Sequence, residues 1–252
     1  CLGIHVTNLI PKIPNASTAA KTRPIAILFV LAKLYSKVLE TLATPFAPPV
    51  SKFQFAFKKG NQCEDVIFIL KTIWERAVEW NFWVFVLDGD VRKAYDYADH
   101  LTIVRELRRK GLPKVLIASY IRELRHQKSI FILDKGTRSK PISRTRGLLQ
   151  GDPWAPKVFT LVLDAAIEKF NRRAQHEQWG LEMLGTRVAI LVFADNYWLV
   201  ARCAVQLQEM KFVLASLFAR TPLVLAAKRA GLDHKCTRQC ATRSHHVRRP
   251  CP

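Results

Sequence analysis

Two aspartates far apart in the chain, Asp90 and Asp195, each follow a short apolar run that is typical of a buried strand. Asp90 comes after residues 82–87, and Asp195 lies in a tight turn at residues 194–196 between predicted strands at residues 188–193 and 197–202. Carboxylates in fixed positions bind Mg²⁺ together with substrate phosphates, and paired ions can stabilise both oxygens of an in-line phosphoryl displacement. An aspartate at a strand end is also a common turn former. The pair therefore indicates a metal site only in the company of other motifs.

The elements that must position these aspartates mix strands and helices without a regular βαβ repeat, so we expect an α+β fold with a sheet covered by helices on one face. Helical spacing of apolar residues predicts helices at residues 25–42, 63–80, 100–110, 113–127, 154–171 and 205–219. Further strands are expected at residues 4–10 and 129–133, with a hairpin or lid after the first, a turn at residues 134–136 and then a polar loop to residue 150.

The composition is that of a folded protein. Hydrophobic residues make up 49% and charged residues 24% of 252 residues, which suits one large domain or a core with two small lobes. The longest apolar run, residues 24–32, is well short of the roughly 18 residues that cross a bilayer. The start at Cys1 rather than Met indicates a fragment of a longer product. The cysteines form no disulfide framework, which favours a reducing, intracellular setting.

The chain is strongly basic. It has 40 Lys and Arg against 20 Asp and Glu, a formal net charge of +20 at pH 7. A charge of this size calls for an anionic partner, and nucleic acid is the first candidate; the alternative is a basic protein that is merely soluble.

Several sequence blocks resemble, in order, the reverse transcriptases of non-LTR (LINE-type) retrotransposons, over about residues 6–235. Any one block is a weak signal, whereas several in the correct order at plausible spacing are specific. The blocks are VTNLIPKIPNASTAAKTRP (6–24), RPIAILFVLAKLYSK (23–37), FAFKKGNQCED (55–65), DVRKAYD (90–96, motif A), QGDPWAP (150–156, motif B) and FADN (193–196, motif C).

The resemblance implies the fingers and palm of a polymerase, with an antiparallel palm sheet backed by helices and the thumb absent or truncated. Residues 1–80 would be fingers-like and residues 81–203 the palm with motifs A, B and C, although part of residues 100–150 could return to the fingers. Residues 204–227 would form a palm helix, and residues 228–252 a basic, disordered tail.

The resemblance also implies roles at the centre of the site. Asp90 and Asp195 would ligate two Mg²⁺ ions, for which Mn²⁺ can substitute, with the backbone carbonyl of Val91 as a further ligand. Tyr95 would lie under the incoming sugar, where its ring would exclude a 2′-hydroxyl. Without the family, Tyr95 is equally well interpreted as a core aromatic residue at a helix start.

Around this centre the family implies contacts to the nucleotide. Gln150 and Gly151 would approach the nucleotide and template, since glycine lets the backbone come close and an amide can hydrogen-bond a sugar or base. The same QGDP sequence is otherwise simply a turn before a helix. Arg23 would bind the triphosphate, with Lys12 and Lys21 as weaker phosphate contacts, because a guanidinium matches phosphate with two hydrogen bonds. For the lysines alone, a solvated surface is the simpler interpretation.

The sequence departs from the family at two positions. Motif C of the family has a second aspartate where this chain has Asn196, and the serine of motif B is replaced by Ala155. The two metal ions would then face two carboxylates instead of three. Weaker metal binding and slower phosphoryl transfer follow from the lost charge.

The C-terminal segment contains the ligand types of a zinc knuckle, Cys236, Cys240, His246 and Cys251, with the spacing C-x3-C-x5-H-x4-C. No apolar residues accompany them to build a core, so a truncated or frameshifted end is favoured over a zinc site. Lys235 is a candidate for the basic residue that lies near the pyrophosphate in the family.

The sequence therefore predicts an RNA-directed DNA polymerase of a LINE-type retroelement, which adds dNTPs to a primer 3′ end on an RNA template. Its partners would be the RNA template, the DNA primer and dNTPs, and the resemblance implies a nuclear location, with no membrane partner. The alternative is an inactive remnant that only binds nucleic acid. A third interpretation, an unrelated basic zinc-binding protein, is based on the C-terminal segment alone.

Overall fold

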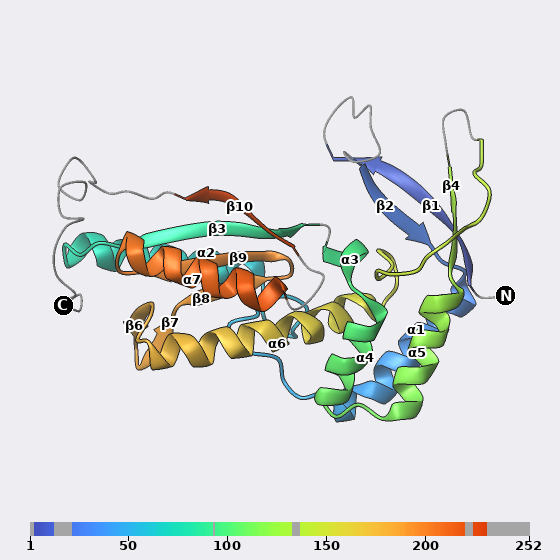
Figure 1. The fold of residues 1–252 in the computed structure, drawn as a ribbon, viewed down its shortest axis with the longest axis horizontal. Coiled ribbons are helices and arrows are strands. Elements are labelled where there is room, and N and C mark those ends of the chain that lie inside the picture. The colour runs from blue at the N-terminus through green and yellow to red at the C-terminus, as the bar shows by residue number, and fades with distance from the viewer. Residues whose placement is uncertain (1–2, 13–21, 93, 133–136, 220–223, 231–252) are drawn as a thin grey trace.

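The computed structural model describes residues 3–12, 22–92, 94–132, 137–219 and 224–230. Its strands form two four-stranded sheets, which lie at opposite ends of the ribbon in Figure 1, and a separate hairpin of β6 (Leu181–Met183) and β7 (Thr186–Val188). The fold is a mixture of α-helices and β-strands, as the sequence predicts. No helix among the described residues is long and apolar enough to span a membrane.

The first sheet has the strand order β2-β1-β4-β5. β1 (Ile4–Pro11) pairs antiparallel with β2 (Thr22–Ile27) and parallel with β4 (Lys128–Phe131), and the short β5 (Ile142–Ser143) pairs with β4. Two helices are adjacent to these strands in the chain, α1 (Val30–Ala43) after β2 and α5 (Lys114–His126) before β4, and they contact each other. Residues from the beginning and the middle of the chain thus build one sheet.

The second sheet is antiparallel throughout and has the order β10-β3-β9-β8. Its strands are β3 (Phe85–Arg92), β8 (Ile190–Phe193), β9 (Asn196–Ala201) and β10 (Val224–Ala230). α7 (Ala204–Ala219) contacts β3, β9 and β10, and it also packs on α6 (Ala155–His176), which runs beneath this sheet in Figure 1. The buried side chains of both helices, such as Ile167, Met210 and Leu214, form the core with Ile190 and Leu199 of the sheet.

The remaining elements connect the two sheets. α4 (His100–Arg109) contacts both α5 and α6, and the short α3 (Ala94–Tyr97) follows β3 directly. A 3-10 turn, η2 (Thr44–Phe46), ends α1. α2 (Cys63–Glu79) contacts β8 of the second sheet, whereas β1, β2 and α1 lie with the first. Residues 1–80 are therefore divided between the two sheets.

Most helices lie where the sequence predicts them. The predicted helices at residues 63–80, 100–110, 113–127 and 205–219 are confirmed as α2, α4, α5 and α7, and the strands at residues 4–10 and 129–133 as β1 and β4. The predicted helix at residues 154–171 is α6 and continues to His176, because Phe170 and Ala174 are still buried. The predicted turn at residues 134–136 lies outside the described residues.

Two boundaries are wrong. The predicted helix at residues 25–42 begins only at Val30, because residues 25–27 pair with β1 as the end of β2. The expected helical segment at residues 204–227 is helical to Ala219, and from Val224 the chain forms β10 along the edge of β3. Pairing with β10 satisfies the backbone N–H and C=O groups on this edge of β3. The spacing of apolar residues, which predicted the helix, carries no information about such pairing.

A buried ionic cluster joins α4 to α6. The Lys110 ammonium donates to the Oδ2 of Asp164 and to the Oε1 of Glu168, at 2.6 Å each, and Lys110 and Asp164 are both buried. The other carboxylate oxygen of Asp164 accepts the backbone N–H of Ser51 at 2.8 Å. Every charge in this cluster has an opposite charge or a donor beside it, which is what allows it to remain buried.

Replacing Lys110 with Met should lower the free energy of unfolding by about 3–5 kcal/mol, because the Asp164 carboxylate would remain buried without its cation. Lys71→Met provides the control, since the Lys71–Glu75 pair is exposed at 3.7 Å and such pairs contribute at most about 1 kcal/mol. Urea unfolding of both variants measures the difference. A loss below about 1 kcal/mol for Lys110→Met would show that the cluster is solvated in solution.

His5 is a second buried polar group, 1% exposed, and its Nε2 lies 2.8 Å from the Oγ of Ser129 across the β1–β4 pair. Burial, together with the nearby positive charge of Arg144, lowers the pKa of His5 from 6.5 to about 4. The neutral imidazole is therefore the form that fits the folded protein.

Lowering the pH from 7 to 5 should destabilise the fold through His5. Between about pH 4 and pH 6.5 the unfolded chain binds a proton that the folded chain does not, so stability falls as the pH falls through this window. The shift corresponds to about 2 kcal/mol at pH 5. In urea unfolding at both pH values, His5→Gln should lose about that much less stability than the natural chain. Equal losses in the two proteins would contradict this assignment.

Candidate functional site

A cavity of about 790 Å³ lies between the two sheets, and we call it the central cavity. It is lined by residues of the first sheet, of the second sheet and of the loop that leads from β5 to α6. Seven of the predicted site residues line it, namely Lys12, Arg23, Asp90, Val91, Gln150, Asp195 and Asn196.

Pairing of β3 with β9 brings the two aspartates together. Asp90 on β3 lies opposite Asn196 on β9, and the backbone N–H of Val91 donates to the carbonyl oxygen of Asp195 at 2.9 Å. Asp195 itself is in the two-residue turn between β8 and β9, as the sequence predicts. The prediction that the first strand ends before Asp90 is wrong, since β3 begins at Phe85 and continues through Asp90 to Arg92. Pairing with both β9 and β10 extends it past the apolar run.

Gly89 lets this strand pair closely with β9. Alternation along β3 buries Leu87, Gly89 and Val91 on one face and leaves Asp90 half-exposed on the other. The ring of Tyr197 lies against Gly89, where any Cβ would overlap it. Burial, with the neighbouring carboxylates of Asp90 and Asp88, raises the pKa of Tyr197 to about 12.

The opposite wall of the central cavity is basic. Arg144 and Arg146 line it along with Lys12 and Arg23. Arg144 is mostly buried and lies 3.5 Å from Asp96, and the guanidinium of Arg146 lies 4.7 Å from the centre of the Tyr97 ring, which also lines the cavity. The sequence analysis missed these two arginines, although their place just before motif B was a usable signal.

Backbone hydrogen bonds fix the loop that carries these arginines. The N–H of Gly147 donates to the carbonyl of Ala98 at 2.8 Å, and the N–H of Leu148 donates to that of Tyr95 at 2.7 Å. At the far end, the N–H of Ala26 on β2 donates to the carbonyl of Gln150 at 2.8 Å. The loop is thus attached to motif A on one side and to the first sheet on the other.

Gly151 and Tyr95 do not line the central cavity. Gly151 has a φ of +124° and packs so closely on the backbone of Ala26 that a Cβ would overlap its carbonyl oxygen, which explains the glycine structurally. Tyr95 stacks on Phe159 of α6 with the ring centres 4.9 Å apart. Burial, and then the charge of Asp195, raises its pKa well above the ordinary range.

Asp152, within motif B, has a structural role that the sequence analysis did not assign. Its carboxylate is buried and accepts hydrogen bonds from Ser36 on α1, from the hydroxyl of Tyr120 on α5 at 3.0 Å, and from the backbone N–H of Trp154 at 3.2 Å. Motif B therefore connects two helices beside the first sheet to the start of α6.

The donor set of the central cavity suits Mg²⁺, which prefers carboxylate and other oxygen ligands. It offers the carboxylates of Asp90 and Asp195 and the amide of Asn196, and it is also lined by Asp96, which lies beside Arg144. Among the described residues, no group of three or more His, Cys, Asp or Glu side chains could hold a metal ion. A metal held here by the described residues would therefore have at most two carboxylate ligands. Lys21 and the Cys and His residues of the C-terminal segment lie outside the described residues.

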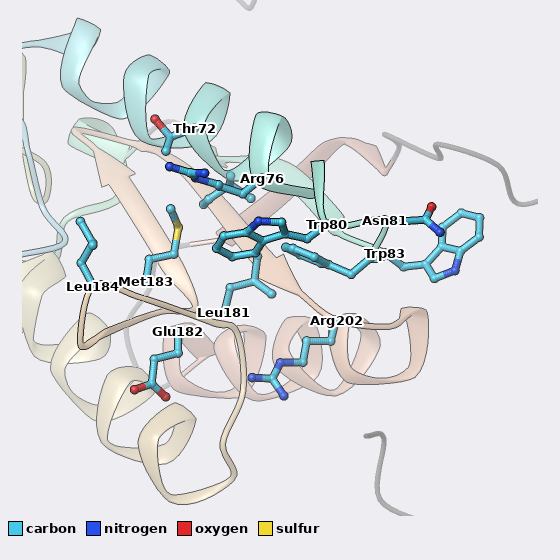
Figure 2. A pocket seen from close by; sticks show the side chains of 12 residues that line it. Thr72, Arg76, Trp80, Asn81, Trp83, Leu181, Glu182, Met183, Leu184 and Arg202 are labelled. Carbon is cyan, nitrogen blue, oxygen red and sulfur yellow. The ribbon is translucent and has the colours of Figure 1, made fainter. Parts of the chain in front are cut away.

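A second cavity of about 760 Å³ lies between the end of α2 and the β6–β7 hairpin (Figure 2). Thr72, Arg76 and Trp80 come from the α2 side, and Leu181 and Met183 face them from the hairpin. None of the predicted site residues lines this cavity.

Replacing Gly89 with Ala should destabilise the chain by about 1–3 kcal/mol, since the added methyl group overlaps the buried Tyr197 ring. In a Tyr197→Leu background the same change should cost markedly less, because the ring is gone. Urea unfolding of the two single variants and the double variant measures this coupling. Additive losses would mean that the ring does not pack on Gly89.

Comparison with known proteins identifies the family to which this chain is related. Residues 10–229 match the family described as reverse transcriptase (RNA-dependent DNA polymerase). The chain is 29% identical over 202 residues to the retrovirus-related Pol polyprotein from type-1 retrotransposable element R2 of Nasonia vitripennis, covering 80% of this chain and 19% of that protein. It is 26% identical over 225 residues to an R2 Pol polyprotein of Popillia japonica, covering 89% of this chain and 31% of that protein. The chain thus spans a third or less of the length of these relatives.

Solved structures agree on the fold. Telomerase from Candida albicans, in complex with a fragment of telomeric RNA, matches with a TM-score of 0.62 at 11% identity, over 90% of this chain and 43% of that chain. Apo telomerase from Candida tropicalis, truncated from its C-terminal domain, matches with a TM-score of 0.60 at 11% identity, over 94% of this chain and 52% of that chain. The resemblance to LINE-type retroelements that the sequence motifs carry is confirmed. The chain belongs to the reverse transcriptase family and is a distant homologue of the R2 retrotransposon Pol polyproteins.

Proposed function

We propose that this chain is the polymerase part of a LINE-type retroelement and adds dNTPs to a primer 3′ end on an RNA template. The observation that carries this proposal is the central cavity, which Asp90 on β3 and Asp195 in the β8–β9 turn line together with arginine and lysine side chains. Carboxylates that hold cations, opposite basic groups that bind phosphates, suit phosphoryl transfer between polyanions.

In this proposal the first sheet, with α1 and α5, is the fingers, and the second sheet, with α6 and α7, is the palm. The proposed palm includes motifs A, B and C within residues 81–203. Because α2 contacts β8, we place the boundary within residues 1–80 before α2. Because β4 pairs with β1, part of residues 100–150 belongs to the proposed fingers.

Asp90 and Asp195 would hold Mg²⁺ or Mn²⁺, together with the carbonyl of Val91. When bound, these ions supply positive charge that activates the primer hydroxyl and stabilises the phosphoryl oxygens. Arg23 is suited to bind the triphosphate, because it lies on β2 across the cavity from the aspartates. Lys12 and, by resemblance, Lys21 would add phosphate contacts.

The sugar and base would be bound beside this centre. Gln150 lines the central cavity and can hydrogen-bond the nucleotide, while Gly151 keeps its backbone against β2. The resemblance assigns the exclusion of ribonucleotides to Tyr95. Its ring is stacked on Phe159 and does not line the central cavity, so this role is assigned by the resemblance alone.

Asn196 favours a second candidate function, a reverse transcriptase fold that binds nucleic acid without turnover. Asn196 lies directly opposite Asp90 in the β3–β9 register, at the position of the third carboxylate of the family. Its amide brings no negative charge to a bound cation. Both candidates predict binding to a primer–template, which weakens steeply as salt increases.

Primer extension on an RNA template with dNTPs and Mg²⁺ or Mn²⁺ tests the proposal. Asn196→Asp should raise incorporation by about tenfold or more, because it restores a charged ligand. Asp90→Asn should reduce it by about 100-fold or more. Asp88→Asn is the matched control, since Asp88 is two residues away on the same strand and does not line the cavity.

Incorporation by the natural chain that Asp90→Asn removes, and Asp88→Asn does not, would support the polymerase. Incorporation only after Asn196→Asp would support the binding-only candidate for the natural chain. If no variant incorporates nucleotides while the chain still binds primer–template, the polymerase proposal is contradicted.

A further inference from the structure

A short segment before α2 covers the outer edge of β8. Gln54 and Val192 form a parallel bridge, in which the N–H of Phe55 donates to the carbonyl of Val192 at 2.9 Å and the N–H of Val192 donates to that of Phe53 at 2.8 Å. This segment therefore lies directly beside the strand that leads into the turn carrying Asp195.

The side chain of Gln54 reaches that turn. It is completely buried, with 0% exposed, and its Oε1 accepts the backbone N–H of Ala194 at 3.3 Å and that of Ala56 at 3.0 Å. Its Nε2 has no hydrogen-bond partner among the described residues. Burying an amide with an unpaired N–H donor costs free energy. The hydrogen bonds that Gln54 makes are therefore those accepted by its Oε1.

The turn needs such support because its backbone is strained. Ala194 has a φ of +56°, in the left-handed region that residues other than glycine seldom adopt. Two hydrogen bonds that hold the turn join the N–H of Val91 to the carbonyl of Asp195 and the N–H of Ala194 to the Oε1 of Gln54. The first hydrogen bond comes from the neighbouring strand β3, and the second comes from a side chain more than a hundred residues earlier in the chain.

We propose that Gln54 is a positioning residue, which keeps the Ala194–Asp195 turn in the conformation that presents the Asp195 carboxylate to a metal ion. Gln54 does not line the central cavity, and it acts through Ala194. The inference rests on the proposed function to the extent that it takes Asp195 as a metal ligand.

A neutral acceptor suits this position. A glutamate could accept the same two hydrogen bonds, but it would bury a carboxylate near Asp195 or become protonated. A methionine keeps the length of the side chain and removes the acceptor. Gln54→Met is therefore the variant that tests the hydrogen bond.

Gln206 provides a matched control. Its Oε1 also accepts two backbone N–H groups, those of Gly180 at 3.3 Å and Arg202 at 3.0 Å, but at the opposite end of β9 from the turn. Gln206→Met removes the same kind of interaction with the same substitution. A merely structural role would make the two variants behave alike.

The experiment measures amide exchange and metal binding in the whole chain. Selective ¹⁵N-alanine labelling allows exchange at the Ala194 amide to be followed by NMR, and Mn²⁺ binding is titrated by EPR. Gln54→Met should speed exchange at Ala194 by about tenfold, the equivalent of one hydrogen bond. It should also weaken Mn²⁺ binding by about fivefold to tenfold, whereas Gln206→Met should change neither. Adding Ala194→Gly to Gln54→Met should recover part of the Mn²⁺ affinity, because glycine adopts this φ without strain.

Unchanged exchange at Ala194, or equal losses of Mn²⁺ affinity in the two methionine variants, would overturn the proposal. Exchange that accelerates while Mn²⁺ affinity stays unchanged would also overturn it. Failure of the proposed function is distinguishable, because it would appear as Mn²⁺ binding that Asp90→Asn does not weaken in the natural chain.

Discussion

The candidate site depends on one interaction, the antiparallel pairing of β3 with β9. This register places Asp90 opposite Asn196 and lets the N–H of Val91 bind the carbonyl of Asp195. It is possible only because Gly89 leaves room for the Tyr197 ring. A shift of one residue in this register would turn Asp90 towards the core and expose Val91. The packing of the buried face against the helices therefore fixes the register, and the register fixes the position of Asp90.

Long-range contacts then complete the site around this pair of strands. The loop before motif B is hydrogen-bonded to α3 and to β2, which brings Arg144 and Arg146 across from the aspartates. Asp152 connects α1 and α5 to the start of α6. The basic residues come from the first sheet and the loop before motif B, whereas the aspartates belong to the second sheet, so the cavity needs both parts folded and in contact.

Sequence reasoning predicted the parts of this site that local patterns carry. The apolar runs before Asp90 and around Asp195 indicated strands, the tight turn indicated a hairpin, and the resemblance of motifs A and C to the family paired the two aspartates. The end of β3, the start of α1 and the presence of β10 could not be predicted, since each depends on pairing with a strand distant in the sequence. Gln54 was missed for the same reason. In the sequence it is one polar residue between two phenylalanines, and only the parallel bridge to Val192 places its side chain at the turn.

The central claim is that Asp90 and Asp195 share a metal ion although Asn196 replaces the third carboxylate. Anomalous diffraction from crystals of the chain soaked in Mn²⁺ tests this most directly, because it locates the ion without requiring turnover. The account predicts an anomalous peak within coordination distance, about 2.0–2.3 Å, of oxygens from both carboxylates. Mn²⁺ bound elsewhere, or no peak at these aspartates at a concentration that occupies other sites, would contradict it.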